Sequence, residues 1–224
     1  MATNIFQYAT RIEIDERRTI YRAISHSGKA LTEIGSPLFY YVNVTLRPCY
    51  QDVYRTIKND YIDMQYGRAP VETQIPHGHT YVAVPNITDP NSDSEAWVPG
   101  GGTTIEAQSA GSGGTSIRLT GFRANNPIMA GDWLQFVYPD SDSDGAFKVY
   151  QVAQSVIASD IGIADVVLNT GLVKPILNNV QVRSGPDVRF RLLATQLPPT
   201  FTIPGSNGSL LYNFTDQVIF REVL

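Results

Sequence analysis

The stretch 131–167 constrains the fold most, because turns and short strand-like runs alternate in it and leave no room for a helix. It opens with a Gly-Asp turn, followed at 133–138 by a run rich in aromatic and β-branched residues. A polar, turn-forming segment at 139–145 leads into a second run at 147–152. This pattern predicts a β-hairpin, and 164–168 predicts a further strand. Strands this short and closely spaced indicate a small barrel or sandwich.

The composition limits the class of protein. The 224 residues suffice for one large or two small domains, and a hydrophobic content of 42% supports a packed core. The net charge is −4 and no basic run is present, so we do not expect a protein that grips phosphate backbones. The single Cys49 excludes an internal disulfide and is expected to be a buried thiol in a reducing cytosol. Without a secretory signal or an apolar run of membrane-spanning length, we expect a soluble protein made in the cytoplasm.

The remaining chain predicts strands around one helix. Alternation about Ile12 and Ile14 predicts a strand, 19–24 a second one and 38–46 the strongest of the N-terminal part. A helix is predicted from apolar residues at helical spacing, namely Tyr50, Val53, Tyr54, Ile57, Tyr61 and Met64. Further strands are expected at 80–84, 116–122, 180–182, 188–193 and 211–223.

Two breaks in the pattern predict the domain organisation. Gly, Ser, Asp and Pro dominate 85–114, which we interpret as a linker or long loop, and Arg-Ser-Gly-Pro at 183–186 marks a second break. The sequence therefore predicts a mainly β protein in which residues 1–95 and 184–224 form a β-sandwich with one α-helix. Residues 96–183 would form an inserted small β-barrel, since an exposed loop tolerates such an insertion.

Two groups of residues are candidate metal ligands. Asp140, Asp142 and Asp144 begin a D-x-D-x-D-G pattern typical of calcium loops, but the twelfth position lacks a carboxylate and no helix flanks the loop. The alternative is a solvated hairpin tip, where Asp and Ser suit turns. His77 and His79 could supply half of a metal site, or they are exposed loop imidazoles.

No arrangement typical of catalysis is visible. The glycine clusters lack the pattern of a phosphate loop, and neither a G-x-S-x-G elbow nor a Cys–His pair is present. We therefore predict no enzyme activity and no cofactor. The many aromatic residues could stack on sugars or bases, or they could form the core, as aromatic strand residues more often do.

The chain resembles the distal tail proteins of long-tailed bacteriophages. The likeness is carried by IMAGDWLQF at 128–136 and KVYQVAQSVIASDIGIADVVL at 148–168, with VRFRLLATQLPPTF at 188–201 and FTDQVIFREVL at 214–224. The opening strands at 17–48 and the predicted helix are also similar to that family.

This resemblance implies a virion protein at the tail tip. It implies a hexameric ring, formed by the β-sandwich, that joins the tail tube protein to the hub or baseplate proteins and the receptor-binding protein. The inserted barrel would be OB-like, point outward and bind host glycan or other tail parts. DNA would only pass through the lumen, which an acidic lining would favour.

Two other classes and one variant stay open at this stage. A carbohydrate-binding module or adhesin would use the inserted barrel and would expose an aromatic residue such as Trp133 as a glycan contact. A glycan hydrolase would need two carboxylates facing each other across a cleft. The acidic residues of the predicted barrel mostly lie in turns; they are Asp132, Asp140, Asp142, Asp144 and Asp160. Another tail or head–tail connector ring is the nearest variant of the ring interpretation.

Overall fold

The structure, a computed structural model, is mainly β with one α-helix and several antiparallel sheets. It describes residues 4–24, 30–65, 71–73, 97, 99–101, 104–138, 148–205 and 209–223. Within these residues, the single α-helix is α1 (Gln51–Gln65), as the apolar spacing predicted. Asp52 lies in its first turn, where a carboxylate stabilises the unpaired N–H groups.

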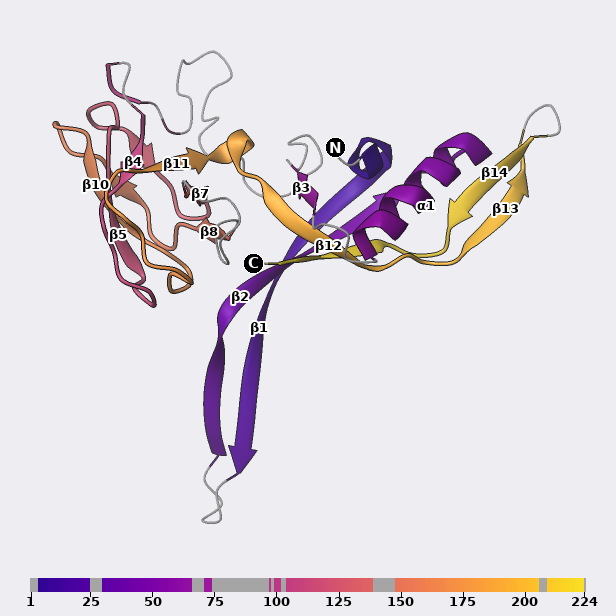
Figure 1. Cartoon of the computed structure of the whole chain (residues 1–224), viewed down its shortest axis with the longest axis horizontal. Helices are drawn as coiled ribbons and strands as arrows, with labels where there is room; N and C mark the ends of the chain where they lie inside the picture. Colours follow the sequence, from indigo (N-terminus) through magenta and orange to yellow (C-terminus); the bar gives the residue numbers. More distant parts are fainter. Residues whose placement is uncertain are drawn as a thin grey trace.

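A five-stranded antiparallel sheet combines strands from both ends of the chain (Figure 1). Its strand order is β1 (Ala9–Ile24), β2 (Ala30–Leu46), β15 (Val218–Glu222), β12 (Phe190–Gln196) and β3 (Val71–Thr73). The central β15 pairs with β2 from Val218 opposite Val44 to Arg221 opposite Tyr41. The last strands of the chain therefore return to the N-terminal sheet.

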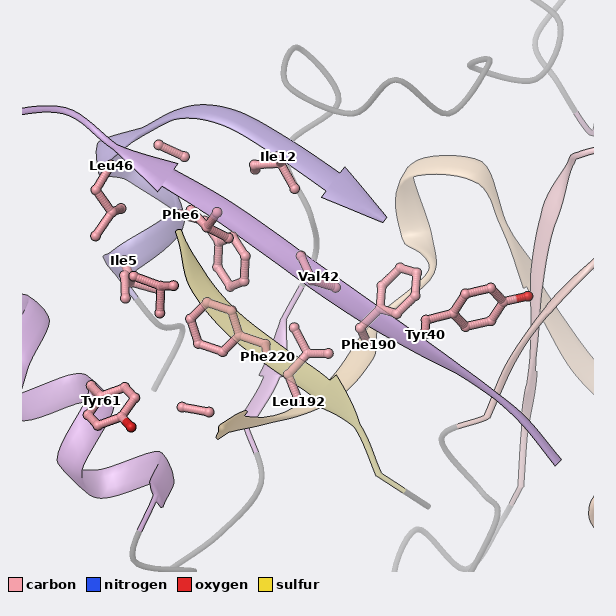
Figure 2. Packing of buried hydrophobic residues seen from close by; sticks show 14 of the residues in the cluster. Ile5, Phe6, Ile12, Tyr40, Val42, Leu46, Tyr61, Phe190, Leu192 and Phe220 are labelled. Atoms are coloured by element: carbon pink, nitrogen blue, oxygen red, sulfur yellow. The ribbon is translucent and has the colours of Figure 1, made fainter. Parts of the chain in front are cut away.

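One face of this sheet carries the first hydrophobic core. Val42 and Phe220 pair across β2 and β15, and the ring of Phe220 lies 5.3 Å from that of Phe6 in η1 (Asn4–Tyr8). Figure 2 shows these side chains between the sheet and α1, whose Ile57 and Tyr61 are buried on the same side. We call the sheet, η1, α1 and the hairpin of β13 (Thr200–Pro204) and β14 (Leu210–Phe214) the body.

A six-stranded antiparallel sheet surrounds a second core. Its strand order is β10 (Ile163–Val167), β5 (Ser116–Thr120), β4 (Glu106–Ala107), β11 (Val180–Ser184), β7 (Trp133–Val137) and β8 (Val149–Gln151). A small two-stranded sheet of β6 (Pro127–Ile128) and β9 (Val156–Ile157) accompanies it, and the 3-10 turn η3 (Gly185–Asp187) leads back to the body. We call this part the insert.

The two edges of the six-stranded sheet approach each other. Directly after β8 and β10, Val152 and Leu168 form an isolated antiparallel bridge. The N–H of Ala153 donates to the carbonyl of Val167 at 2.7 Å, and the N–H of Asn169 donates to that of Gln151 at 2.9 Å. No closed barrel is formed by strand pairing among the described residues, because this contact is a single bridge.

The sequence patterns predicted some of these elements correctly, and other elements differ from the prediction. The hairpin predicted within 131–167 is confirmed, since β7 and β8 pair antiparallel. The two strands predicted near Ile12 and at 19–24 are one continuous strand, β1, because β2 pairs along its whole length. The predicted linker also contains β4, which pairs with β5 and β11 in the second sheet.

The central position of Phe220 predicts a large loss of stability on truncation. Its side chain is 0% exposed, and Phe220→Ala is expected to lower the free energy of unfolding by about 3–5 kcal/mol through lost burial and a residual cavity. Phe201→Ala in β13 is the matched control, because this ring is 46% exposed. Urea titration of both variants measures the difference, and equal losses would contradict the assignment of the core.

Candidate functional site

Trp133 lies in the core and does not form the exposed glycan contact that a binding module would need. Its side chain is 6% exposed, and its ring packs edge-on against Tyr40 at 4.8 Å and against Phe190 at 5.3 Å. The reason is the alternation along β7: Trp133 faces the body, while Leu134 and Phe136 face the core of the insert. The β7–β8 hairpin is thus buried on both faces.

The other residues singled out in the sequence form no site in the described part. Asp140, Asp142 and Asp144 lie outside the described residues, as do His77 and His79. Among the described residues, no group of three His, Cys, Asp or Glu side chains could hold a metal ion.

Asp132 and Cys49 have structural roles. The Asp132 carboxylate is buried and accepts hydrogen bonds from the indole N–H of Trp97 at 2.8 Å and the backbone N–H of Met129 at 2.9 Å, which fixes the turn before β7. Cys49 is a free, buried cysteine, as predicted, and burial raises the pKa of its thiol.

A buried ion pair joins the insert to the body. Lys148, next to β8, places its Nζ 2.6 Å from Oε2 of Glu222 in β15, and both side chains are 0% exposed. Glu222 also accepts hydrogen bonds from the backbone N–H groups of Val149 at 3.0 Å and Tyr40 at 3.3 Å. One carboxylate therefore connects β2 and β15 of the body with β8 of the insert.

Burial acts on the two charges in opposite directions. It lowers the pKa of Lys148 and raises the pKa of Glu222, because each ionised form loses its hydration. Attraction between the two groups opposes both shifts. The ammonium also lies 4.4 Å from the centre of the Tyr40 ring, which adds a cation–π contact.

Two polar contacts accompany the ion pair. The hydroxyl of Tyr40 accepts a hydrogen bond from the side-chain amide of Asn169 at 3.0 Å. The side chain of Gln135 forms two hydrogen bonds with the backbone of Arg189, at 2.8 and 3.1 Å, in the manner of a strand pair. We call these contacts, with Trp133 and the ion pair, the junction.

The distal part of the β1–β2 hairpin leaves the body as a two-stranded arm (Figure 1). β1 is an edge strand of the sheet, and β15 pairs with β2 only from Tyr41 to Val44. We call residues 17–24 and 30–39 the β-arm. Among the described residues, they therefore pair only with each other. At about 3.3 Å per residue, the β-arm extends about 25 Å. Neither of its outer backbone edges pairs with another strand in the part of the chain that the structure describes.

A second two-stranded element, the β13–β14 hairpin, projects from another side of the body (Figure 1). It is anchored at the middle of β14, where the ring of Tyr212 stacks on that of Tyr54 in α1 at 4.4 Å. Phe201 is 46% exposed and Leu210 51% exposed. From Leu192 to Thr215 the sequence contains no Asp, Glu, Lys, Arg or His, although 17% of the chain is charged.

The β-arm and the uncharged hairpin were not identified from the sequence as sites of interaction. The absence of charge over 192–215 is visible in the sequence and could have marked the hairpin, since interface cores are depleted of charge. The length of the β-arm was not predicted, because the polar residues near position 17 suggested a break between two strands.

Comparisons with known proteins add no family. No family model matches the chain, and no curated protein matches it. In the part of the chain that the structure describes, no helix combines the length and apolar character that a membrane crossing requires.

The ion pair predicts strongly non-additive effects of substitution. Lys148→Met is expected to lower the free energy of unfolding by about 3–5 kcal/mol, because it leaves the Glu222 carboxylate buried without its counter-charge. The double variant Lys148→Met/Glu222→Leu should recover most of that loss, since two apolar side chains need no pairing. Urea titration of the two singles and the double measures the coupling.

The exposed pair of Arg118 and Asp165 is the matched control for this double-mutant cycle. It has two hydrogen bonds at 2.7 and 2.9 Å, but both side chains are more than half exposed. Arg118→Met should therefore change stability far less than Lys148→Met. Equal losses of unfolding free energy at the two pairs, or additive losses at the buried pair, would contradict the prediction. Burial would then not determine how much an ion pair contributes to stability.

Proposed function

We propose that this protein is a structural subunit of a ring at the distal end of a phage tail. The ring would join the tail tube to the hub and the receptor-binding apparatus. The observation that carries the proposal is the β-arm, a two-stranded ribbon that projects from the body and whose two outer edges pair with no other described strand.

A two-stranded ribbon of this kind gains stability from a neighbouring chain. An isolated hairpin is marginally stable in water, and unpaired edge groups are a template for pairing with another strand. A contact between the β-arm and a different surface of a second copy is head-to-tail, and such contacts close into rings when the rotation permits. Six copies and the tail-tube and hub partners come from the resemblance to distal tail proteins.

The proposal assigns different roles to the two parts of the chain. We propose that residues 1–95 and 184–224 form a β-sandwich that builds the ring, and that residues 96–183 form an OB-like barrel displayed on it, incompletely closed because its edges meet at a single bridge. The approach of β8 and β10 at the Val152–Leu168 bridge supports a small barrel. The buried junction supports a fixed orientation of the barrel, which suits a part that presents host glycan or other tail proteins to the ring.

The binding-module alternative is less well supported. Its named contact, Trp133, is buried at the junction and offers no face to a sugar. The hydrolase alternative gains no support from Asp132, whose buried carboxylate is occupied by the Trp97 indole and a backbone N–H.

Shortening the β-arm tests the proposal. Thr19 and Gly35 are paired, so residues 20–34 can be replaced by Asn-Gly, a two-residue turn that closes antiparallel strands. Light scattering after size exclusion, at two concentrations, should give a species of six chains for the natural protein. The shortened variant should give single chains, because it lacks the ribbon that the neighbour pairs with.

The variant leaves Leu38 and the body core in place, so an unchanged urea transition is the control for folding. A natural protein that stays a single chain at both concentrations would contradict the ring. A shortened variant that still assembles would contradict the role of the β-arm.

A further inference from the structure

One edge of the β13–β14 hairpin is occupied and the other is free. On the α1 side, Tyr212 in β14 exchanges two backbone hydrogen bonds with Cys49, at 2.8 and 3.0 Å. β13 lies on the side away from α1 (Figure 1), and β14 is its only partner among the described strands. Its outer edge therefore offers unpaired backbone groups.

The register of the hairpin identifies these groups. Because Tyr212 directs its N–H and carbonyl to Cys49, its partner Thr202 directs its own backbone groups away from β14. Hydrogen bonds from Gly205 to Ser209 and from Thr215 to Pro199 confirm the alternation. Thr200 and Thr202 therefore point their N–H groups outward.

Proline limits how a partner strand can add to this edge. The outward positions on either side of the two threonines are occupied by Pro198 and Pro204, which have no N–H. A partner can thus accept hydrogen bonds only from Thr200 and Thr202. The edge is short and restricts pairing to one register.

We infer that the β13 edge receives the β2 edge of the β-arm from a second copy of this chain. This inference rests on the proposed ring and names the surface that the β-arm contacts. The β-arm and the β13–β14 hairpin leave the body in different directions, so they cannot pair within one chain (Figure 1). Pairing between copies satisfies the free edges of both ribbons at once.

The distribution of charge selects β2 rather than β1 as the strand that pairs. In β1, charged residues recur along the strand, including Glu16, Arg17, Arg18 and Arg22, and charge on an edge strand opposes pairing with another chain. In β2, Glu33 is the only charged residue from Ala30 to Leu46. A strand poor in charge matches the uncharged hairpin, since the core of an interface is depleted of charge.

Thr202→Pro tests the edge. It removes one of the two outward N–H groups and no hydrogen bond within the hairpin, so the folded chain should persist while the ring is lost. Thr202→Val is the matched control, because it keeps the N–H and the β-branched shape. Light scattering should give six chains for the natural protein and for Thr202→Val, and single chains for Thr202→Pro.

The outcomes separate this inference from the proposed function. A Thr202→Pro protein that assembles like the natural one overturns the β13 edge as the acceptor and leaves the ring intact. A natural protein that stays a single chain at both concentrations overturns the ring and the acceptor together.

A photo-crosslink identifies the occupant without relying on the proline variant. The photoreactive p-benzoylphenylalanine can replace Phe201, because this ring is 46% exposed and leaves room for the added benzoyl group. In a mixture of unlabelled and ¹⁵N-labelled protein, mass spectrometry should find links between chains that end at residues 30–39. Links to any other segment would overturn the β-arm as the partner.

Discussion

The contact between the insert, with its own hydrophobic core, and the body centres on the carboxylate of Glu222. It accepts hydrogen bonds from Tyr40 in β2, from Val149 in β8 and from the Lys148 ammonium, and no part of its side chain is exposed. Neither charge is stable in this position alone, because an uncompensated buried charge is strongly destabilising. Loss of either Lys148 or Glu222 alone is therefore expected to weaken the docking of β8 on the body.

An apolar pair could fill the same space at similar or better stability, so stability alone does not explain the ion pair. Its directional contacts fix one arrangement, since the carboxylate meets donors on two different sheets. The edge-on packing of Trp133 against Tyr40 and Phe190 contributes burial but less direction. We therefore interpret the ion pair as the contact that sets the orientation of the insert relative to the body.

The elements with local signals were predictable from the sequence. The apolar stripe of α1 and the strand–loop–strand pattern of β7 and β8 are both satisfied within about 20 residues, and both are present. The junction was not predictable in this way. Lys148 and Glu222 are 74 residues apart, and alternation alone does not say which face of β8 meets another domain. The same ambiguity left Trp133 open as a glycan contact of the binding-module alternative, although aromatic strand residues more often belong to the core.

The free edges differ in how they are protected, and this difference bears on assembly. β1 carries charge along its length, while β13 has none and is limited by Pro198 and Pro204. Charge discourages every partner, whereas flanking prolines leave a short edge open and restrict its register. An uncharged edge of this kind would promote non-specific association if it were longer, because any strand could then pair with it in several registers. An edge with only two outward N–H donors instead requires further contacts from its partner. It therefore favours a neighbour that other contacts already hold in place, as in the ring that we propose.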